Sequence, residues 1–81
     1  MKVSGGDGSS YENAIVISDC NNQEGVKQEY MEVRKRCGEY RLIRQVLLEN
    51  EGKMYDKLEL ELRNGEKIDL YFDITDFFGK F

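Results

Sequence analysis

Three aspartates near the C-terminus are the first candidates for chemistry. Asp69 and Asp73 alternate with Tyr71 along a run of period two, and Asp76 follows shortly after. Carboxylates at such spacing can share a proton or hold a hard cation. A sheet face open to water lacks the concave, water-excluding surroundings of a catalytic site, so we interpret these groups first as solvated charges. The alternative is a metal- or small-ligand-binding protein, or a hydrolase, that uses Asp69, Asp73 and Asp76.

The stretch GGDGSSYENAIVI, residues 5–17, is a second candidate. A Walker-type phosphate loop needs a lysine after its glycines and a helix beyond it, whereas β-branched residues typical of a strand follow here. A calcium loop needs a glutamate at its twelfth position, where this chain has Ile17 or Ser18. We therefore expect residues 1–10 to be a flexible lead-in, with a capping turn from Ser9 to Glu12, and no ligand site.

The chain has no histidine and two cysteines, Cys20 and Cys37. Two thiols without histidine are too few for a zinc site, and neither has a general base beside it. A helix between them would hold the sulfur atoms about 20 Å apart, well beyond the reach of a disulfide. We predict two free thiols, no metal and no cofactor.

Size and charge narrow the classes of partner. Eighty-one residues suffice for one domain, which we place at residues 11–81. The net charge of −4 opposes nucleic acid, because phosphates would be repelled. We find neither a signal peptide nor an apolar run of membrane-spanning length, so we expect no membrane partner and a cytoplasmic location.

The elements that must position these residues follow from hydrophobic periodicity. Residues 14–17 form a short strand, and residues 23–37 form the one long helix, ended by Gly38. Its apolar face consists of Val26, Tyr30, Val33 and Cys37. Three further strands are expected over 41–49, 54–63 and 66–74.

The predicted fold class is α+β with the order β-α-β-β-β. It has one mostly antiparallel four-stranded sheet, one long helix packed on one face and a short C-terminal helical turn. The first strand runs parallel either to strand 41–49 or to strand 66–74, and both alternatives stay open.

The alternation of apolar residues predicts the hairpin registers. A three-residue connection Arg63-Asn64-Gly65 pairs Leu60 with Ile68, whereas a two-residue turn would set Leu60 opposite Asp69 and split the core. The same form at residues 50–52 pairs Leu48 with Met54. That register turns Leu42, Val46 and Leu48 toward the helix and leaves Arg44 as an inward-facing misfit.

Two motifs at the ends of the chain carry a family resemblance. The opening GDGSSYENAI and the ending YFDITDFFGK are similar to a group of small bacterial proteins without an assigned activity, which share a GDGSS-x-E-x-AI opening and a YFDIT-x-FFGK close. The similarity spans residues 5–80. It implies a common fold and assigns no functional residue.

The outer face of the predicted sheet is the candidate interaction surface. One helix cannot cover both faces, so Ile43, Leu47, Tyr55 and Tyr71 are left on the side away from it. They are either covered by the C-terminal phenylalanines Phe77, Phe78 and Phe81 or remain an apolar patch typical of interfaces. We therefore expect a small non-catalytic protein-interaction module whose partner is an unidentified protein or a second copy of itself.

Overall fold

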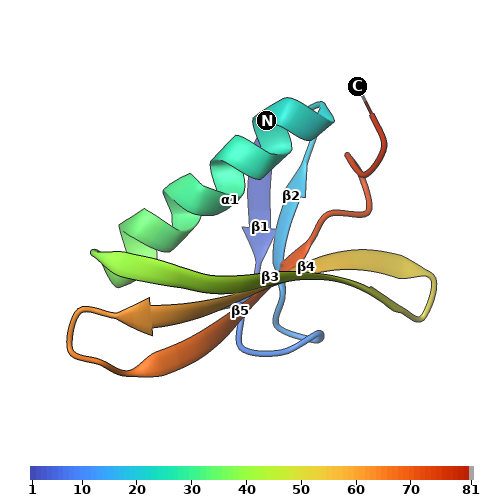
Figure 1. The fold of residues 1–81 in the computed structure, drawn as a ribbon. Coiled ribbons are helices and arrows are strands. Elements are labelled where there is room, and N and C mark those ends of the chain that lie inside the picture. The colour runs from blue at the N-terminus through green and yellow to red at the C-terminus, as the bar shows by residue number, and fades with distance from the viewer. Residues whose placement is uncertain (81) are drawn as a thin grey trace.

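The computed structural model describes residues 1–80 and packs one helix on a five-stranded sheet (Figure 1). The sheet order is β1-β2-β5-β4-β3, and every neighbouring pair is antiparallel except β2 and β5, which are parallel. The elements are β1 (Lys2–Gly5), β2 (Ile15–Ser18), α1 (Asn22–Cys37), β3 (Tyr40–Asn50), β4 (Lys53–Leu62) and β5 (Lys67–Asp73). The α+β class is confirmed, and the first predicted strand lies beside the last.

The predicted sheet of four strands is wrong by one, because β1 forms within the segment expected to be a flexible lead-in. Lys2 pairs with Ser18 and Gly5 with Ile15. A Cβ atom on Gly5 would lie 2.3 Å from the carbonyl oxygen of Ala14, so the hairpin needs glycine there. β1 is short and exposed along its length, and it therefore has no apolar alternation that a sequence pattern would reveal.

Helix α1 begins and ends where its capping residues predict. The side chain of Asn21 accepts from the backbone N–H of Glu24, and the Glu24 carboxylate accepts from that of Asn21. Gly38, with φ of 72°, ends the helix. Cys20 and Cys37 lie just before its start and at its last residue, and both are free thiols, as predicted.

The predicted register of β4 and β5 is confirmed. Leu60 pairs with Ile68 and Leu58 with Leu70. The Leu62 N–H donates to the Glu66 carbonyl at 2.8 Å, and Gly65 has φ of 88°, as a three-residue connection requires. The apolar residues of both strands therefore lie on the helix side.

The predicted register of β3 and β4 is wrong by one residue. The connection is a two-residue turn of Glu51 and Gly52, with φ values of 53° and 79°, and Leu48 pairs with Tyr55 instead of Met54. Positive φ at both turn positions matches the twist of the flanking strands. The slip moves Val46 and Leu48 to the face away from the helix.

A bulge in β3 explains the Arg44 misfit. The register shifts between Leu42 and Arg44, so Ile43 is the extra residue. Leu42 remains opposite Leu60 on the helix side, whereas Arg44 turns to the outer face, where it pairs with Glu59 at 2.8 Å. The charged residue is thus kept out of the core.

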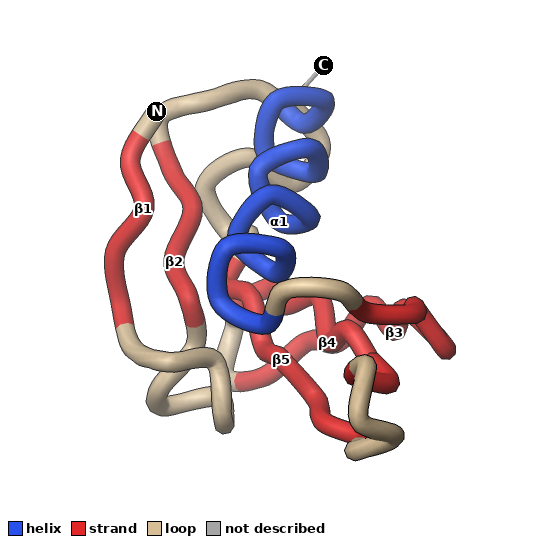
Figure 2. The backbone as a smooth tube through the Cα atoms, turned by 90° about the vertical axis from the view of Figure 1, so that its left-hand side faces the viewer, coloured by secondary structure: helices blue, strands red, loops and turns tan. Residues whose placement is uncertain are grey.

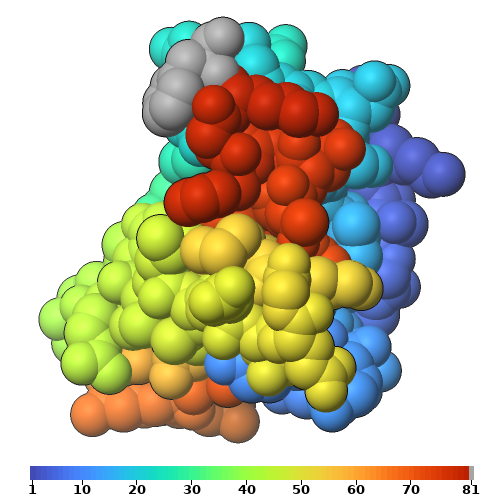
Figure 3. Space-filling view, turned by 90° about the vertical axis from the view of Figure 1, so that its right-hand side faces the viewer, coloured from blue at the N-terminus to red at the C-terminus, as the bar shows by residue number. Residues whose placement is uncertain are grey.

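The C-terminal segment forms a turn against the start of α1, and in Figure 3 it lies above the tip of the β3–β4 hairpin. Asp73 caps this turn by accepting from the Thr75 N–H at 3.0 Å. Phe77 is fully buried. Its ring packs so closely on Gly25 that a Cβ atom added there would lie only 2.4 Å from it. The core comprises Ile15, Ile17, Val33, Leu58, Leu60, Leu70, Phe72, Ile74 and Phe77.

Candidate functional site

β3 is a free edge of the sheet. Its one strand neighbour is β4, and it lies on the side of the sheet opposite β1 and β2 (Figure 2). Exposed fractions of 39% for Leu42, 43% for Ile43 and 52% for Leu47 place large apolar side chains along it. Two of the four predicted surface residues, Ile43 and Leu47, are therefore exposed on this edge strand.

The four predicted surface residues do not share one face. The Tyr30 hydroxyl on α1 donates to Gln45 Oε1 at 3.0 Å, so Gln45 and its same-face neighbour Leu47 lie on the helix side. Ile43 occupies the bulge, and Tyr55 and Tyr71 lie on the outer face. The single patch expected from alternation is thus divided by the register slip and the bulge.

Tyr11 covers the two outer-face tyrosines. Its ring centroid lies 4.9 Å from that of Tyr55 and 5.0 Å from that of Tyr71. Tyr55 is 5% exposed and Tyr71 is half-buried. The covering residue comes from the opening loop, whereas Phe77 packs on the helix side, Phe78 is exposed, and Phe81 lies outside the described residues.

The opening loop holds Tyr11 in place through backbone contacts. The Tyr71 N–H donates to the Gly8 carbonyl at 2.7 Å, so the loop follows β5 at the point just before β2 begins. Gly8 is buried with φ of 84°, and a Cβ there would lie 3.0 Å from Leu70. The loop turns are capped by Asp7 and Ser10 instead of Ser9. Its glycines and polar residues thus have a structural role.

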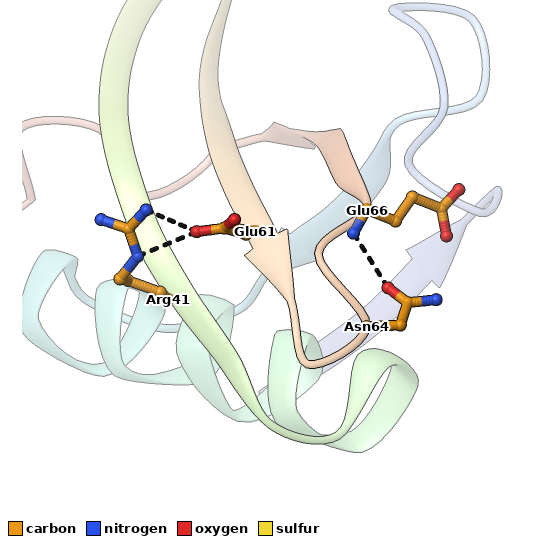
Figure 4. A network of polar contacts seen from close by, with 4 residues as sticks. All are labelled: Arg41, Glu61, Asn64 and Glu66. Atoms are coloured by element: carbon orange, nitrogen blue, oxygen red, sulfur yellow. Dashed lines mark hydrogen bonds and ion pairs between the residues drawn. The ribbon is translucent and has the colours of Figure 1, made fainter.

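The arginines of β3 form ion pairs with glutamates of the neighbouring strand β4. Arg41 pairs with Glu61 on the face away from the helix (Figure 4), and Arg44 pairs with Glu59. Hydrogen bonds from these arginines hold the pKa of the Glu61 and Glu59 carboxyls below their ordinary values. Because each arginine is paired across the strand, neither projects alone from the free edge.

A shallow apolar groove extends the exposed surface from β3 toward the helix. It has a volume of about 630 Å³ and is bordered by Tyr30, Met31 and Tyr40, with Lys27, Arg34 and Lys35 around it. Met31 is 54% exposed. The bond between Tyr30 and Gln45 joins this groove to the helix side of β3.

The three C-terminal aspartates are engaged separately. Asp69 is exposed opposite Glu59, Asp73 caps the C-terminal turn, and Asp76 accepts from the Asp19 N–H at 2.8 Å. Within residues 1–80, no three carboxylate or thiol groups come together as metal ligands would. The same residues include no helix with the length and apolarity that crossing a bilayer requires.

Two buried carboxyl groups lie between α1 and the sheet, and the sequence pattern did not identify them. Glu29 is 1% exposed and Asp56 is 4% exposed. No described N–H or O–H group donates to either oxygen of Glu29. Burial, and secondarily the neighbouring Asp56 carboxyl, raises the pKa of Glu29 to about 10. Glu29 is therefore protonated at neutral pH and can donate to Asp56.

Comparison with protein-family models, with curated proteins and with solved structures finds no match for this chain. The resemblance to the small bacterial proteins therefore stays a prediction, and function has to be argued from the surface itself.

Proposed function

We propose that the protein is a small, non-catalytic protein-interaction module that binds an extended segment along the free edge of β3. The observation that carries this proposal is the position of β3, an 11-residue strand at the edge of the sheet with exposed Leu42, Ile43 and Leu47. An edge strand offers unpaired N–H and C=O groups to another chain, and neighbouring apolar side chains add affinity.

The sequence of β3 supports this proposal, because it lacks two residue types that commonly keep an edge strand from pairing with another chain. β3 contains neither proline nor lysine. The bulge at Ile43 interrupts its first half, whereas residues 44–50 keep one continuous register with β4. A regular seven-residue segment is long enough to pair with another strand.

The tyrosines of the outer face contribute less than the sequence suggested. Tyr11 packs on both Tyr55 and Tyr71, so the proposed surface retains Ile43 and Leu47 and adds Leu42. The metal- or ligand-binding alternative stays a prediction without geometric support, because its three aspartates are engaged separately.

A strand-shaped peptide tests the proposal directly. We would titrate ¹⁵N-labelled protein with an alternating valine and threonine peptide that is N-methylated on one edge to prevent its aggregation. Binding should shift the amide resonances of β3 and leave those of β1 unchanged. The control peptide, N-methylated on both edges, cannot pair and should produce no shifts. Absence of shifts in β3 with the first peptide would contradict the proposal.

A further inference from the structure

We propose that the strand bound by β3 is β3 of a second copy of this chain, antiparallel and related by a two-fold axis that passes beside Leu47. This inference rests on the proposed function and names its partner. Its basis is the direction of the backbone groups of β3, together with the charge pattern along the strand.

The hairpin registers show which β3 residues direct their backbone groups outward. In a two-residue turn the closing pair, here Asn50 and Lys53, exchanges both hydrogen bonds, and such pairs then alternate along the strands. Leu48, Val46 and Arg44 therefore bond to β4. Gln45, Leu47 and Glu49 direct their N–H and C=O groups to the free edge.

The β4–β5 hairpin leads independently to the same assignment of the outward-facing residues of β3. The Leu62 N–H bonds to Glu66, so the even-numbered residues of β4 face β5. Its odd-numbered residues, including Tyr55 and Lys57, are left to bond β3, where they pair with Leu48 and Val46.

In a pairing with its two-fold axis at Leu47, the backbone groups of Gln45, Leu47 and Glu49 all bond to the partner strand. Leu47 lies opposite the partner's Leu47, and Gln45 lies opposite the partner's Glu49. The remaining pairs, Val46 with the partner's Leu48 and Arg44 with the partner's Asn50, are the alternating pairs without hydrogen bonds. Every pair joins side chains on the same face, as antiparallel strands require.

Other symmetric registers are less favourable. An axis at Val46 would set the bulged Ile43 opposite the partner's Glu49. An axis at Leu48 would set Gln45 opposite the partner's Glu51, which lies in the turn. An axis at Gln45 would bring the bulged Ile43 into the pairing, and an axis at Glu49 would set two glutamates directly opposite each other. The axis at Leu47 avoids all three problems.

The side chains suit this register. Val46 and Leu48 form two apolar pairs with their counterparts on the outer face, and the 52%-exposed Leu47 gains a leucine neighbour on the helix side. Gln45 accepts from Tyr30 through Oε1, which leaves its amide N–H groups to donate to the partner's Glu49.

The charge pattern favours an antiparallel partner of the same sequence. Arg44 lies at the start of the paired segment 44–50, and Glu49 lies near its end. Antiparallel pairing about Leu47 sets Glu49 opposite the partner's Gln45, whereas in-register parallel pairing would place each Arg44 and each Glu49 beside its own counterpart. The short interface predicts a weak, concentration-dependent dimer.

Sedimentation equilibrium from about 10 μM to about 1 mM tests the dimer, a range that covers weak association. The parent should dimerise, and Leu47→Lys, which sets two lysines together at the axis, should weaken dimerisation more than tenfold. Phe78 at the C-terminal turn is similarly exposed, at 45%. Phe78→Lys should therefore leave dimerisation unchanged. Circular dichroism verifies that both variants fold.

Cysteine cross-linking tests the register. In a Cys20→Ser, Cys37→Ser background, Leu47→Cys should form a dimer disulfide on treatment with diamide, because the Cα atoms of such a pair lie about 5.5 Å apart. Gln45→Cys, displaced from its own counterpart along the strand, should not cross-link. A Gln45→Cys cross-link, or a dimer unaffected by Leu47→Lys, would overturn this register.

These experiments distinguish failure of the dimer from failure of strand binding by β3. A chain that stays monomeric throughout, yet shows β3 shifts with the strand-shaped peptide, overturns the dimer and retains strand binding. A monomer that shows no β3 shifts with the peptide overturns both.

Discussion

Glu29 of α1 and Asp56 of β4 face each other between helix and sheet, with 1% and 4% of their surfaces exposed. Burial, and secondarily the neighbouring Asp56 carboxyl, raises the pKa of Glu29 to about 10, so Glu29 is protonated at neutral pH. The packing of the helix on the sheet should therefore be sensitive to pH.

Stability should fall as pH rises. The ordinary pKa of Glu29 is 4.5, and in the folded chain it is about 10. Between these values the unfolded chain releases a proton that the folded chain retains, so the free energy of unfolding decreases by up to about 1.4 kcal/mol per pH unit. Glu29→Gln should flatten this dependence and raise the urea midpoint at pH 8.

Glu32→Gln is the matched control for that measurement. Glu32 is also buried on α1, but it already accepts from Gln28 at 3.0 Å and Arg36 at 3.2 Å. This variant should keep the slope of stability against pH. A Glu29→Gln protein with the parent's slope would contradict the raised pKa of Glu29.

Gly25→Ala should destabilise the protein although alanine favours helix formation. The helix gains at most about 1 kcal/mol from the substitution, whereas the added Cβ would lie 2.4 Å from the Phe77 ring. Overpacking of this kind costs about 1–3 kcal/mol. Thermal unfolding of Gly25→Ala, Phe77→Leu and the double variant gives the test: the smaller leucine side chain should reduce or reverse the cost of alanine.

Tyr11→Ala should loosen the opening loop and expose Tyr55. Each aromatic contact of Tyr11 contributes about 0.5–1.5 kcal/mol beyond buried area, so a total loss of about 1–3 kcal/mol is expected. Tyr11→Phe keeps the ring and should behave like the parent. Because the chain has no tryptophan, iodide quenching of tyrosine emission can monitor the exposure. Equal quenching in all three proteins would argue against the covering role.

Glu51→Asn should stabilise the β3–β4 hairpin. Glu51 has φ of 53°, which is uncommon for glutamate, and asparagine before glycine is the preferred pair for this turn. We expect a gain of about 0.5–1 kcal/mol in urea unfolding, a typical size for relieving a disfavoured backbone conformation. Glu39→Asn, on the exposed segment before β3, should have little effect.

The register of β4 and β5 was predictable because both strands have one clearly apolar face. Leu58, Leu60, Ile68 and Leu70 allow only one connection length that brings them together. β3 is different, since its apolar residues occupy both faces and every register leaves some of them inward. The inward position predicted for Arg44 remained a misfit, and it was the one signal from which the slip and the bulge could have been inferred.

The buried acids and β1 escaped prediction for other physical reasons. β1 is exposed along its length and has no apolar alternation. Glutamates at helical spacing are typical of a solvated face, and the burial of Glu29 depends on its packing against Asp56 of β4, which is distant in sequence. Ile43 and Leu47 are exposed as predicted, but the register slip puts Leu47 on the helix side instead of the outer face. The covering of Tyr55 and Tyr71 depends on Tyr11, which is distant in sequence.

The parallel contact between β2 and β5 has a consequence for the order of folding. It consists of two register pairs, Ile15 with Phe72 and Val16 with Asp73, and joins opposite ends of the chain. The β3–β4–β5 meander closes through short connections, so its loop-closure entropy is lower. The meander should therefore form before the rate-limiting step and β2 should join it afterwards, so that Ile15→Val accelerates unfolding and barely slows refolding.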